Sequence, residues 1–404
     1  MNEMLPNISK QNTTHQSVLV ALGIIAIIAS AFHFWPLEEM SFWKLVNLTN
    51  LSILLGVVIY VAFTYNNKDL KLSLLPPVSV WAYIAFHFLS IAYAETFSRP
   101  IIYSIKILLV FAGGYLFFMQ AFQNKKMLAY VPRVIIAAVI ISIGSAIYFQ
   151  HVFRVSEGGF FGSRYKYGTY TGIMASFAVV YLLSGRRLRD YALAFIIILT
   201  FSLSVRSIGG ALGVLVGLSV ALFFSKDRYL RLSLLTGLLL VVFLAIAFNY
   251  SLRNDFKLIE NDSHDLRQRY IEWQAEINML EKYAISGSGG GSINDYRSNF
   301  YYLMPKLNTL QPFDQNGWLT VPAEIGVFGL LCFIWIFYDH VRPLLHSLSY
   351  ISSEMRRINI SLLAALSASC VCNVFSSVHY NGVLIAYVLM LALSKSISHK
   401  SEKG

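Results

Sequence analysis

The feature that most constrains this sequence is a series of apolar runs, many of them about 20 residues long, separated by short charged connections. A run of that length crosses a lipid bilayer as a helix. Only 13% of the residues are charged, whereas soluble proteins carry about 25%, and the mean hydropathy is +0.58. The sequence therefore predicts an all-α, polytopic membrane protein with about twelve transmembrane helices, at residues 17–35, 46–65, 73–94, 101–122, 130–149, 168–184, 191–205, 208–225, 231–250, 318–338, 359–377 and 382–397.

Lysine and arginine in the short connections indicate the orientation, because basic loops stay on the cytoplasmic side. The bases of alternate connections fall on one side, whereas the other side carries Glu38, Glu39 and Glu95. We therefore expect both termini in the cytoplasm. The net charge of +11 follows from these spread-out loops and does not indicate a nucleic-acid partner. The cytoplasmic set comprises Lys68, Lys71, Lys125, Lys126, Arg186, Arg187, Arg189, Lys226, Arg228, Arg231, Arg342, Arg356, Arg357, Lys395, Lys400 and Lys403.

The chain divides into three parts: helices 1–9 in residues 1–250, one large outer loop domain in 251–317, and helices 10–12 with a cytoplasmic tail in 318–404. Inside the loop, Tyr270, Trp273, Ile277 and Leu280 recur at three- and four-residue spacing, which predicts a helix over 265–283. The glycine-rich run 286–292 then ends this helix. Such a run can bind phosphate through its amides, but it matches no known nucleotide-binding pattern, so we expect a flexible turn over the bundle.

Basic side chains on the outer side are candidates for an anion-binding site, because a charge near a membrane span is costly and is usually functional. Arg206 lies in a tight turn between two spans, and Arg267 and Arg269 lie on the loop helix. Lys106 lies just inside the outer end of the fourth span, and Arg164 lies in an outer loop. A planar guanidinium matches phosphate oxygens two at a time. For Arg164 simple solvation, and for Lys106 extension to the interface, remain the alternatives.

Several short sequence motifs follow one another along the chain and include some of these basic residues. An arginine in a tight outer turn precedes the large loop, which holds an arginine four residues before a tryptophan, and an N-x-x-L … E-x-G-x-x-G signature opens the next span. With these motifs the chain resembles the O-antigen ligase and O-antigen polymerase superfamily of bacterial envelopes, which includes O-linked oligosaccharyltransferases. The resemblance covers roughly residues 155–337. The residues that carry it are Arg206, Arg269, Trp273, Asn316, Leu319, Glu324, Gly326 and Gly329.

The resemblance implies a metal-independent glycosyltransferase without a cofactor, in the bacterial inner membrane, with its large loop in the periplasm. Its donor would be a glycan on undecaprenyl pyrophosphate, and its acceptor a glycan that is lipid-linked or part of lipid A–core. Arg206 and Arg269 match the family arginines that stabilise the departing pyrophosphate. Lys106, Arg267 and Arg164 are further pyrophosphate-binding candidates. No cluster of Asp, His and Glu at ligand spacing predicts a metal site on the outer face.

The chain departs from the family at one position. Ligases and oligosaccharyltransferases of this family usually have a histidine before the signature asparagine, and here that position is Gln315, which is no general base near neutral pH. Asp314 could take the proton instead, or His379 could reach the site from the last outer connection, or the pyrophosphate could leave ahead of attack. Because polymerases vary more at this position, the glutamine narrowly favours a surface-polysaccharide polymerase over an O-antigen ligase.

The remaining candidates have positioning roles. We expect Glu324 to orient an arginine or a loop amide, and we place Asn316 and Trp273 in the same structural class. His87, in the third span, is expected to be a hydrogen-bonded core residue, and His379 could equally be an interfacial residue with one hydrogen bond. A flippase for lipid-linked sugars is the alternative outside the enzyme class. It would show charged or broken helices near mid-membrane and related halves, whereas the charges here gather at one face.

Overall fold

The computed structural model describes residues 5–31, 53–58, 75–153, 161, 164–185, 187–204, 207–248, 264–293, 316–348, 353–379 and 381–401. Every regular element within these ranges is helical, and no strand occurs among them. The predicted all-α class is therefore confirmed for the part of the chain that is described.

Helices occupy the positions of the predicted spans, although only residues 53–58 of the second one, 46–65, are described as helical. The loop helix predicted over 265–283 is also confirmed, as α12. The helices are α1 (Leu5–Ser30), α3 (Val78–Ser90), α4 (Ser98–Ile107), α5 (Tyr115–Ala121), α6 (Lys125–Tyr148), α7 (Arg164–Leu183), α8 (Leu188–Ser204), α9 (Ile208–Phe224), α10 (Arg228–Phe248), α12 (His264–Tyr283), α14 (Gly317–Ser347), α15 (Ser353–Phe375) and α16 (Asn381–Ser401).

Four helices in the described residues are long and apolar enough to cross a membrane: Ser98–Ala121, Met127–His151, Gly317–Ser347 and Glu354–Phe375. Four further helices are apolar but shorter, at Ser17–Ser30, Val78–Tyr93, Ile208–Phe224 and Val383–Ser398. A multi-pass membrane protein is thus supported, while the count of twelve spans stays a prediction.

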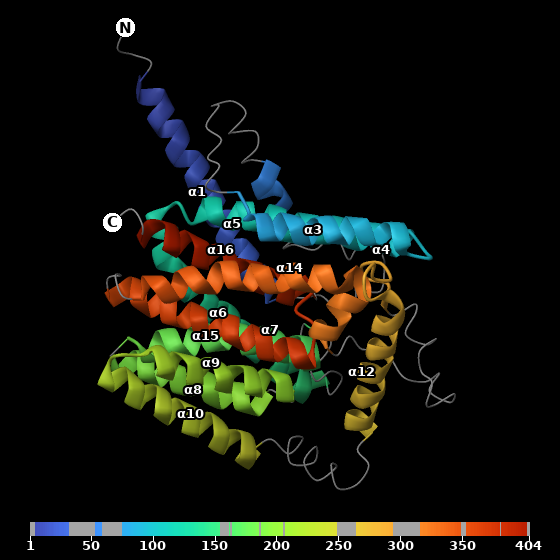
Figure 1. The fold of residues 1–404 in the computed structure, drawn as a ribbon. Coiled ribbons are helices and arrows are strands. Elements are labelled where there is room, and N and C mark those ends of the chain that lie inside the picture. The colour runs from blue at the N-terminus through green and yellow to red at the C-terminus, as the bar shows by residue number, and fades with distance from the viewer. Residues whose placement is uncertain are drawn as a thin grey trace.

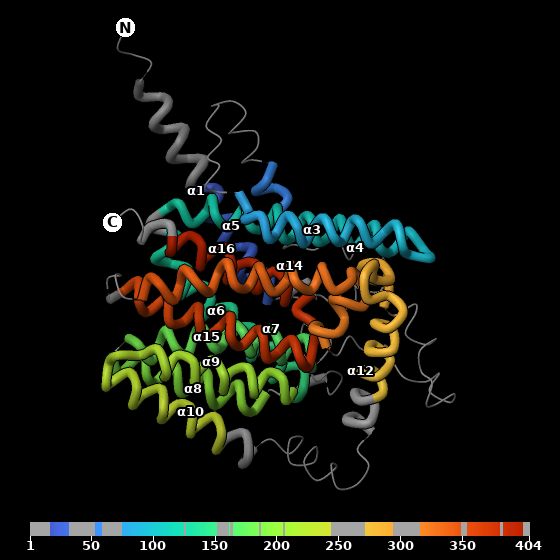
Figure 2. Tube along the Cα trace, in the orientation of Figure 1, coloured from blue at the N-terminus to red at the C-terminus, as the bar shows by residue number. Residues whose placement is uncertain are grey.

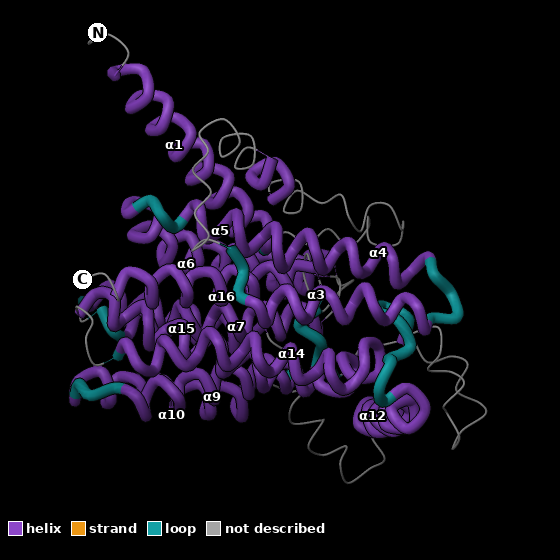
Figure 3. The backbone as a smooth tube through the Cα atoms, turned by 45° about the horizontal axis from the view of Figure 1, so that its top comes forward, coloured by secondary structure: helices purple, strands orange, loops and turns teal. Residues whose placement is uncertain are grey.

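The apolar helices lie side by side in one bundle, and α12 crosses one end of it (Figure 1). Contacts run from α3 to α14, from α14 to α15, and from α15 to α9 and α7, with α10 outside α9; the tube in Figure 2 follows the same order. Seen after rotation, α12 is viewed almost along its own axis while the bundle helices extend sideways (Figure 3). α12 packs on α14, so a polar helix caps the apolar bundle.

The centre of the bundle is built from small residues. A Cβ added to Gly210 on α9 would lie 2.6 Å from the carbonyl oxygen of Gly168 on α7, and one on Gly213 would lie 2.5 Å from Cys372 Sγ on α15. Glycine therefore lets these three helices approach closely, as small residues do in membrane bundles. Cys372 is fully buried here and is not part of a disulfide.

The helix that carries Lys106 continues through three segments. α4 leads into a π-helical segment, η4 (Leu108–Gly114), and then into α5. Such π segments leave the regular hydrogen-bond ladder and are frequent at functional sites. Lys106 lies two residues before η4, on the last turn of α4.

Candidate active site at the α12 end of the bundle

A break in α14 organises this end of the molecule. Gly326 has φ 78° and ψ 170°, a conformation that is essentially restricted to glycine. Just before the break, the carbonyl oxygens of Ala323 and Glu324 accept hydrogen bonds from the backbone N–H groups of Ser288 and Gly289, each at 2.9 Å. We call this joint between residues 284–289 and 323–327 the α12–α14 latch.

Glycine is required on both sides of the latch. A Cβ at Gly326 would lie 2.1 Å from the carbonyl oxygen of Ile285, and a Cβ at Gly287, where φ is 69°, would lie 2.2 Å from the carbonyl oxygen of Glu324. After the break, Val327 N donates to the carbonyl oxygen of Ala284 at 2.7 Å. The glycine of the E-x-G signature therefore opens the helix so that the loop can bind to it.

The glycine-rich run is a buried, hydrogen-bonded turn, not the flexible turn over the bundle that its composition suggests. Gly287, Gly289 and Gly290 are buried. Gly290 N donates to Ser90 Oγ at 3.1 Å, in addition to the latch bonds above. Because most of its amides already bind protein acceptors, the run is not arranged as a phosphate cradle.

Glu324 fastens the same segment through its side chain. It is 4% exposed, and its Oε1 accepts a hydrogen bond from Ile293 N at 3.4 Å. This is a contact with a loop amide, one of the two expected for this residue. Its orienting role in a reaction remains a prediction.

Asn316 begins α14. Its side-chain Oδ1 accepts from Trp318 N at 3.0 Å, which is an N-terminal cap. The Trp318 indole N–H then donates to the carbonyl oxygen of Cys370 on α15, also at 3.0 Å. The signature asparagine thus fixes where α14 starts. Gln315 and Asp314, which directly precede it, lie outside the described residues.

Two buried carboxylates lie on α12. Glu272 and Glu276 are 0% exposed, and Thr320 Oγ1 on α14 donates to Glu276 Oε1 at 3.3 Å. A buried carboxylate needs hydrogen bonds or a cation, and for Glu276 the hydroxyl of Thr320 provides one such hydrogen bond. Trp273, between them, is half-buried. The backbone positions of Arg267 and Arg269 lie on the first two turns of this helix.

A second polar cluster lies beside the latch, around the connection between α15 and α16. The His379 ring is hydrogen-bonded on both sides, through Nε2 to the Tyr83 hydroxyl at 2.5 Å and through Nδ1 to Ser377 Oγ at 2.9 Å. Lys106 Nζ donates to the carbonyl oxygen of His379 at 3.0 Å. Phe333 of α14 packs on the His379 ring at 5.4 Å between ring centroids.

Burial, with the nearby Lys106 charge, lowers the pKa of His379 to about 3. The imidazole is therefore neutral at physiological pH, and both of its nitrogens are engaged by protein side chains. This arrangement weighs against His379 as the acceptor's base and favours a positioning role.

The structure confirms that His87 is buried but does not show the hydrogen bond expected for it. It is buried, at 2% exposed, but neither ring nitrogen has a hydrogen-bond partner among the described residues. Its ring packs edge-on against Tyr83 at 4.8 Å and is tilted against Tyr103 at 5.6 Å. The expected hydrogen bond was wrong because aromatic rings and the Gly290 backbone surround the imidazole.

The structure brings together only some of the predicted site residues. Lys106 meets His379, and Glu324 binds the segment that follows α12. Asn316 begins α14, and Trp273 lies on α12. Arg206 lies outside the described residues, between α8 and α9 in the sequence. The side chains of Arg164, Arg267 and Arg269 lie outside them too.

Sequence reasoning missed Tyr83, Ser377 and the buried pair Glu272 and Glu276. The spacing of the two glutamates, one helical turn apart on α12, was a visible signal, because such a pair shares one helix face. Tyr83 gave no signal, since its partner His379 lies 296 residues away in the sequence.

Within the described residues, no three His, Cys, Asp or Glu side chains are grouped as metal ligands would be. The metal independence of the reaction remains a prediction.

Comparison with known families identifies one stretch of the chain. Residues 192–334 match the family described as O-antigen ligase, and no curated protein matches the chain. The matched stretch runs from α8 into α14 and includes Arg206, Arg269, Asn316 and Glu324. Over residues 192–334, this match confirms the predicted resemblance to the O-antigen ligase and polymerase superfamily.

Proposed function

We propose that this protein is an integral-membrane glycosyltransferase of the bacterial inner membrane that extends a surface polysaccharide at the periplasmic face. It transfers a glycan from undecaprenyl pyrophosphate to an acceptor glycan. The observation that supports this is the O-antigen ligase match over residues 192–334, because that stretch contains Arg206 and Arg269, the two arginines that match those of the family.

The proposed reaction is a substitution at the anomeric carbon of the donor sugar. The acceptor hydroxyl oxygen forms a bond to this carbon, the bond from the carbon to the pyrophosphate oxygen breaks, and undecaprenyl pyrophosphate leaves with the bonding electron pair. The hydroxyl proton goes to a base or to water. Fixed cations that stabilise the departing charge lower the barrier, which is the role we assign to Arg206 and Arg269.

The described geometry supports supplementary roles for nearby residues. Lys106 is held by its hydrogen bond to the carbonyl oxygen of His379, in the connection between α15 and α16. A third cation there would add to the attraction for a diphosphate. The α12–α14 latch joins the C-terminal end of α12 to α14, and Arg267 and Arg269 lie on the first two turns of the same helix.

Asp314 and His379 are the candidate proton acceptors, and Gln315 occupies the position of the family's histidine. Alanine at each position separates the possibilities. Loss of turnover in Asp314→Ala alone identifies that carboxylate as the base. If all three variants keep full turnover, no local side chain of this set removes the proton, and pyrophosphate departure leads the reaction.

The ligase function is the alternative, and the description of the matched family favours it. Here the acceptor would be lipid A–core. Gln315, which replaces the histidine usual in ligases, favours the polymerase.

Deletion of the gene, followed by gel analysis of lipopolysaccharide, distinguishes the two functions. A single repeat unit on core indicates a lost polymerase. Bare core with accumulated lipid-linked polymer indicates a lost ligase. Unchanged lipopolysaccharide together with unchanged capsule and exopolysaccharide would contradict both functions.

Metal independence is tested separately with a metal chelator. Loss of glycan transfer on treatment with the chelator would contradict it.

A further inference from the structure

A cleft of about 550 Å³ is lined in part by the turn between α9 and α10; in Figure 1 this turn lies at the end of the bundle opposite α12. Three segments that are distant in sequence form the cleft. These are the turn after α7 at residues 184–185, the turn between α9 and α10 at residues 225–227, and Arg356 and Arg357 near the start of α15. The proposed glycosyl transfer does not use this cleft.

The charge of the lining is positive. Lys226, Arg356 and Arg357 face a single carboxylate, Asp227. That carboxylate already caps α10, since its Oδ1 accepts a hydrogen bond from Tyr229 N at 3.0 Å. The cleft therefore holds more cationic charge than its own lining neutralises.

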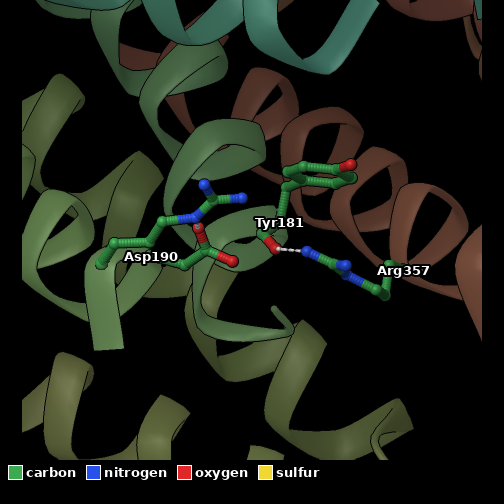
Figure 4. A network of polar contacts seen from close by, with 4 residues as sticks. Tyr181, Asp190 and Arg357 are labelled. Carbon is green, nitrogen blue, oxygen red and sulfur yellow. Dashed lines mark hydrogen bonds and ion pairs between the residues drawn. The ribbon is translucent and has the colours of Figure 1, made fainter. Parts of the chain in front are cut away.

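Arg357 is held in place without an acidic partner in the described part of the chain. Its Nη2 donates to the carbonyl oxygen of Tyr181 at 3.1 Å, and its guanidinium lies over the Tyr181 ring at 4.6 Å from the centroid (Figure 4). The nearby carboxylate of Asp190 pairs instead with Arg189, at 3.5 Å. Arg357 is thus oriented while its charge remains available.

Two guanidinium nitrogens in this region are buried and have no acceptor among the described residues, Arg356 Nη2 and Arg357 Nε. A buried donor without an acceptor costs free energy. The oxygens of an anion in the adjacent cleft are acceptors of the right kind, and a planar guanidinium matches phosphate geometry.

We propose that this cleft binds the phosphate group of an anionic membrane lipid. Basic pockets between membrane helices on the cytoplasmic side bind such headgroups, and the positive-inside pattern predicts that this end is cytoplasmic. Leu183, Leu230 and Ile360 also line the cleft and provide an apolar wall for the lipid beyond its phosphate. The site would lie across the membrane from the proposed reaction.

The test uses the full-length protein in phosphatidylcholine nanodiscs, titrated with fluorescent phosphatidylglycerol. We expect saturable binding that Arg356→Gln and Lys226→Gln each weaken, roughly fivefold for each charge removed. Arg356 is preferred to Arg357 because Arg357 packs on Tyr181. The matched control is Arg189→Gln, which removes a charge at the same end of the bundle but outside the cleft. Melting temperatures show that each variant is folded.

A second arm separates a lipid from a free anion. Added inorganic phosphate should not displace the labelled lipid at millimolar concentration if the apolar wall contributes; displacement would identify free phosphate as the occupant, and thus overturn the assignment to a lipid. Equal phosphatidylglycerol binding by the wild type, Arg356→Gln and Lys226→Gln would overturn the site altogether. So would a loss of binding in Arg189→Gln as large as in the cleft variants.

Discussion

The two ends of the bundle differ in how their polar groups are arranged. At the α12 end, the latch binds the loop amides, Tyr83 and Ser377 bind the His379 ring, and Lys106 binds a carbonyl oxygen, while both His87 nitrogens and Trp273 Nε1 lack partners among the described residues. At the other end, three cations line an open cleft, and two guanidinium nitrogens lack acceptors among the described residues. The latch and the His379 cluster are thus closed by internal bonds, whereas the cationic lining faces a cleft that we propose a ligand fills.

The largest effect should come from breaking the latch. Gly326→Val places a β-branched residue in a glycine-only conformation and drives Cβ into the Ile285 carbonyl, so we expect a loss of about 3 kcal/mol or more in stability. The measurement is the thermal unfolding midpoint in detergent.

Gly144→Ala is the matched control, since a Cβ there would meet nothing within 4 Å. It should unfold at the wild-type temperature. A wild-type midpoint for Gly326→Val would show that the α12 end is not fixed by the break in α14.

A smaller loss is expected from Tyr83→Phe. Removal of this hydroxyl leaves His379 Nε2 buried without its partner, which costs about 1–3 kcal/mol. Unfolding of the variant beside the wild type checks this. An unchanged unfolding midpoint would mean that the 2.5 Å hydrogen bond between Tyr83 and His379 does not contribute to the stability of the protein.

The pH dependence of stability sharpens the same point. The folded pKa of His379 is about 3 and its ordinary value is 6.5, so between these values the unfolded chain binds the extra proton. Stability is therefore full above pH 6.5 and falls by up to about 1.4 kcal/mol per unit as the pH drops.

His379→Gln removes this group while Tyr83, His87 and Lys106, the titratable side chains around it, stay in place. Melting temperatures between pH 7 and pH 5 should fall less steeply in the variant than in the wild type. Parallel slopes would show that His379 is not held neutral by burial.

The smallest effect should come from the opposite end. Arg189 is 71% exposed and pairs with Asp190 at 3.5 Å, and exposed pairs of this kind contribute little. Arg189→Gln should change stability by less than about 0.5 kcal/mol. A drop as large as that of Tyr83→Phe would mean that this end depends on internal ion pairs as well.

Local patterns in the sequence predicted the helices well. The spacing of Tyr270, Trp273, Ile277 and Leu280 placed a helix over 265–283, and the structure has one over His264–Tyr283. This succeeds because helical periodicity depends on neighbours within a few residues.

Contacts between distant segments were not predictable in the same way. The glycine-rich run needs its positive φ angles because α14 opens at Gly326, some 40 residues later. The same helical spacing does not reveal that Glu272 and Glu276 are buried, with Thr320 of α14 donating a hydrogen bond to Glu276. Whether a polar side chain is buried depends on what packs over it, and a single sequence does not state this.

The most direct test of the proposed mechanism is glycan transfer by reconstituted Arg269→Ala protein, with undecaprenyl-pyrophosphate-linked repeat units as donor. We expect the rate to fall at least about 100-fold, since the variant loses a fixed charge at the leaving group, while Lys282→Ala, at the other end of the same helix, keeps the wild-type rate. A wild-type rate for folded Arg269→Ala would contradict the assignment of this arginine to the pyrophosphate.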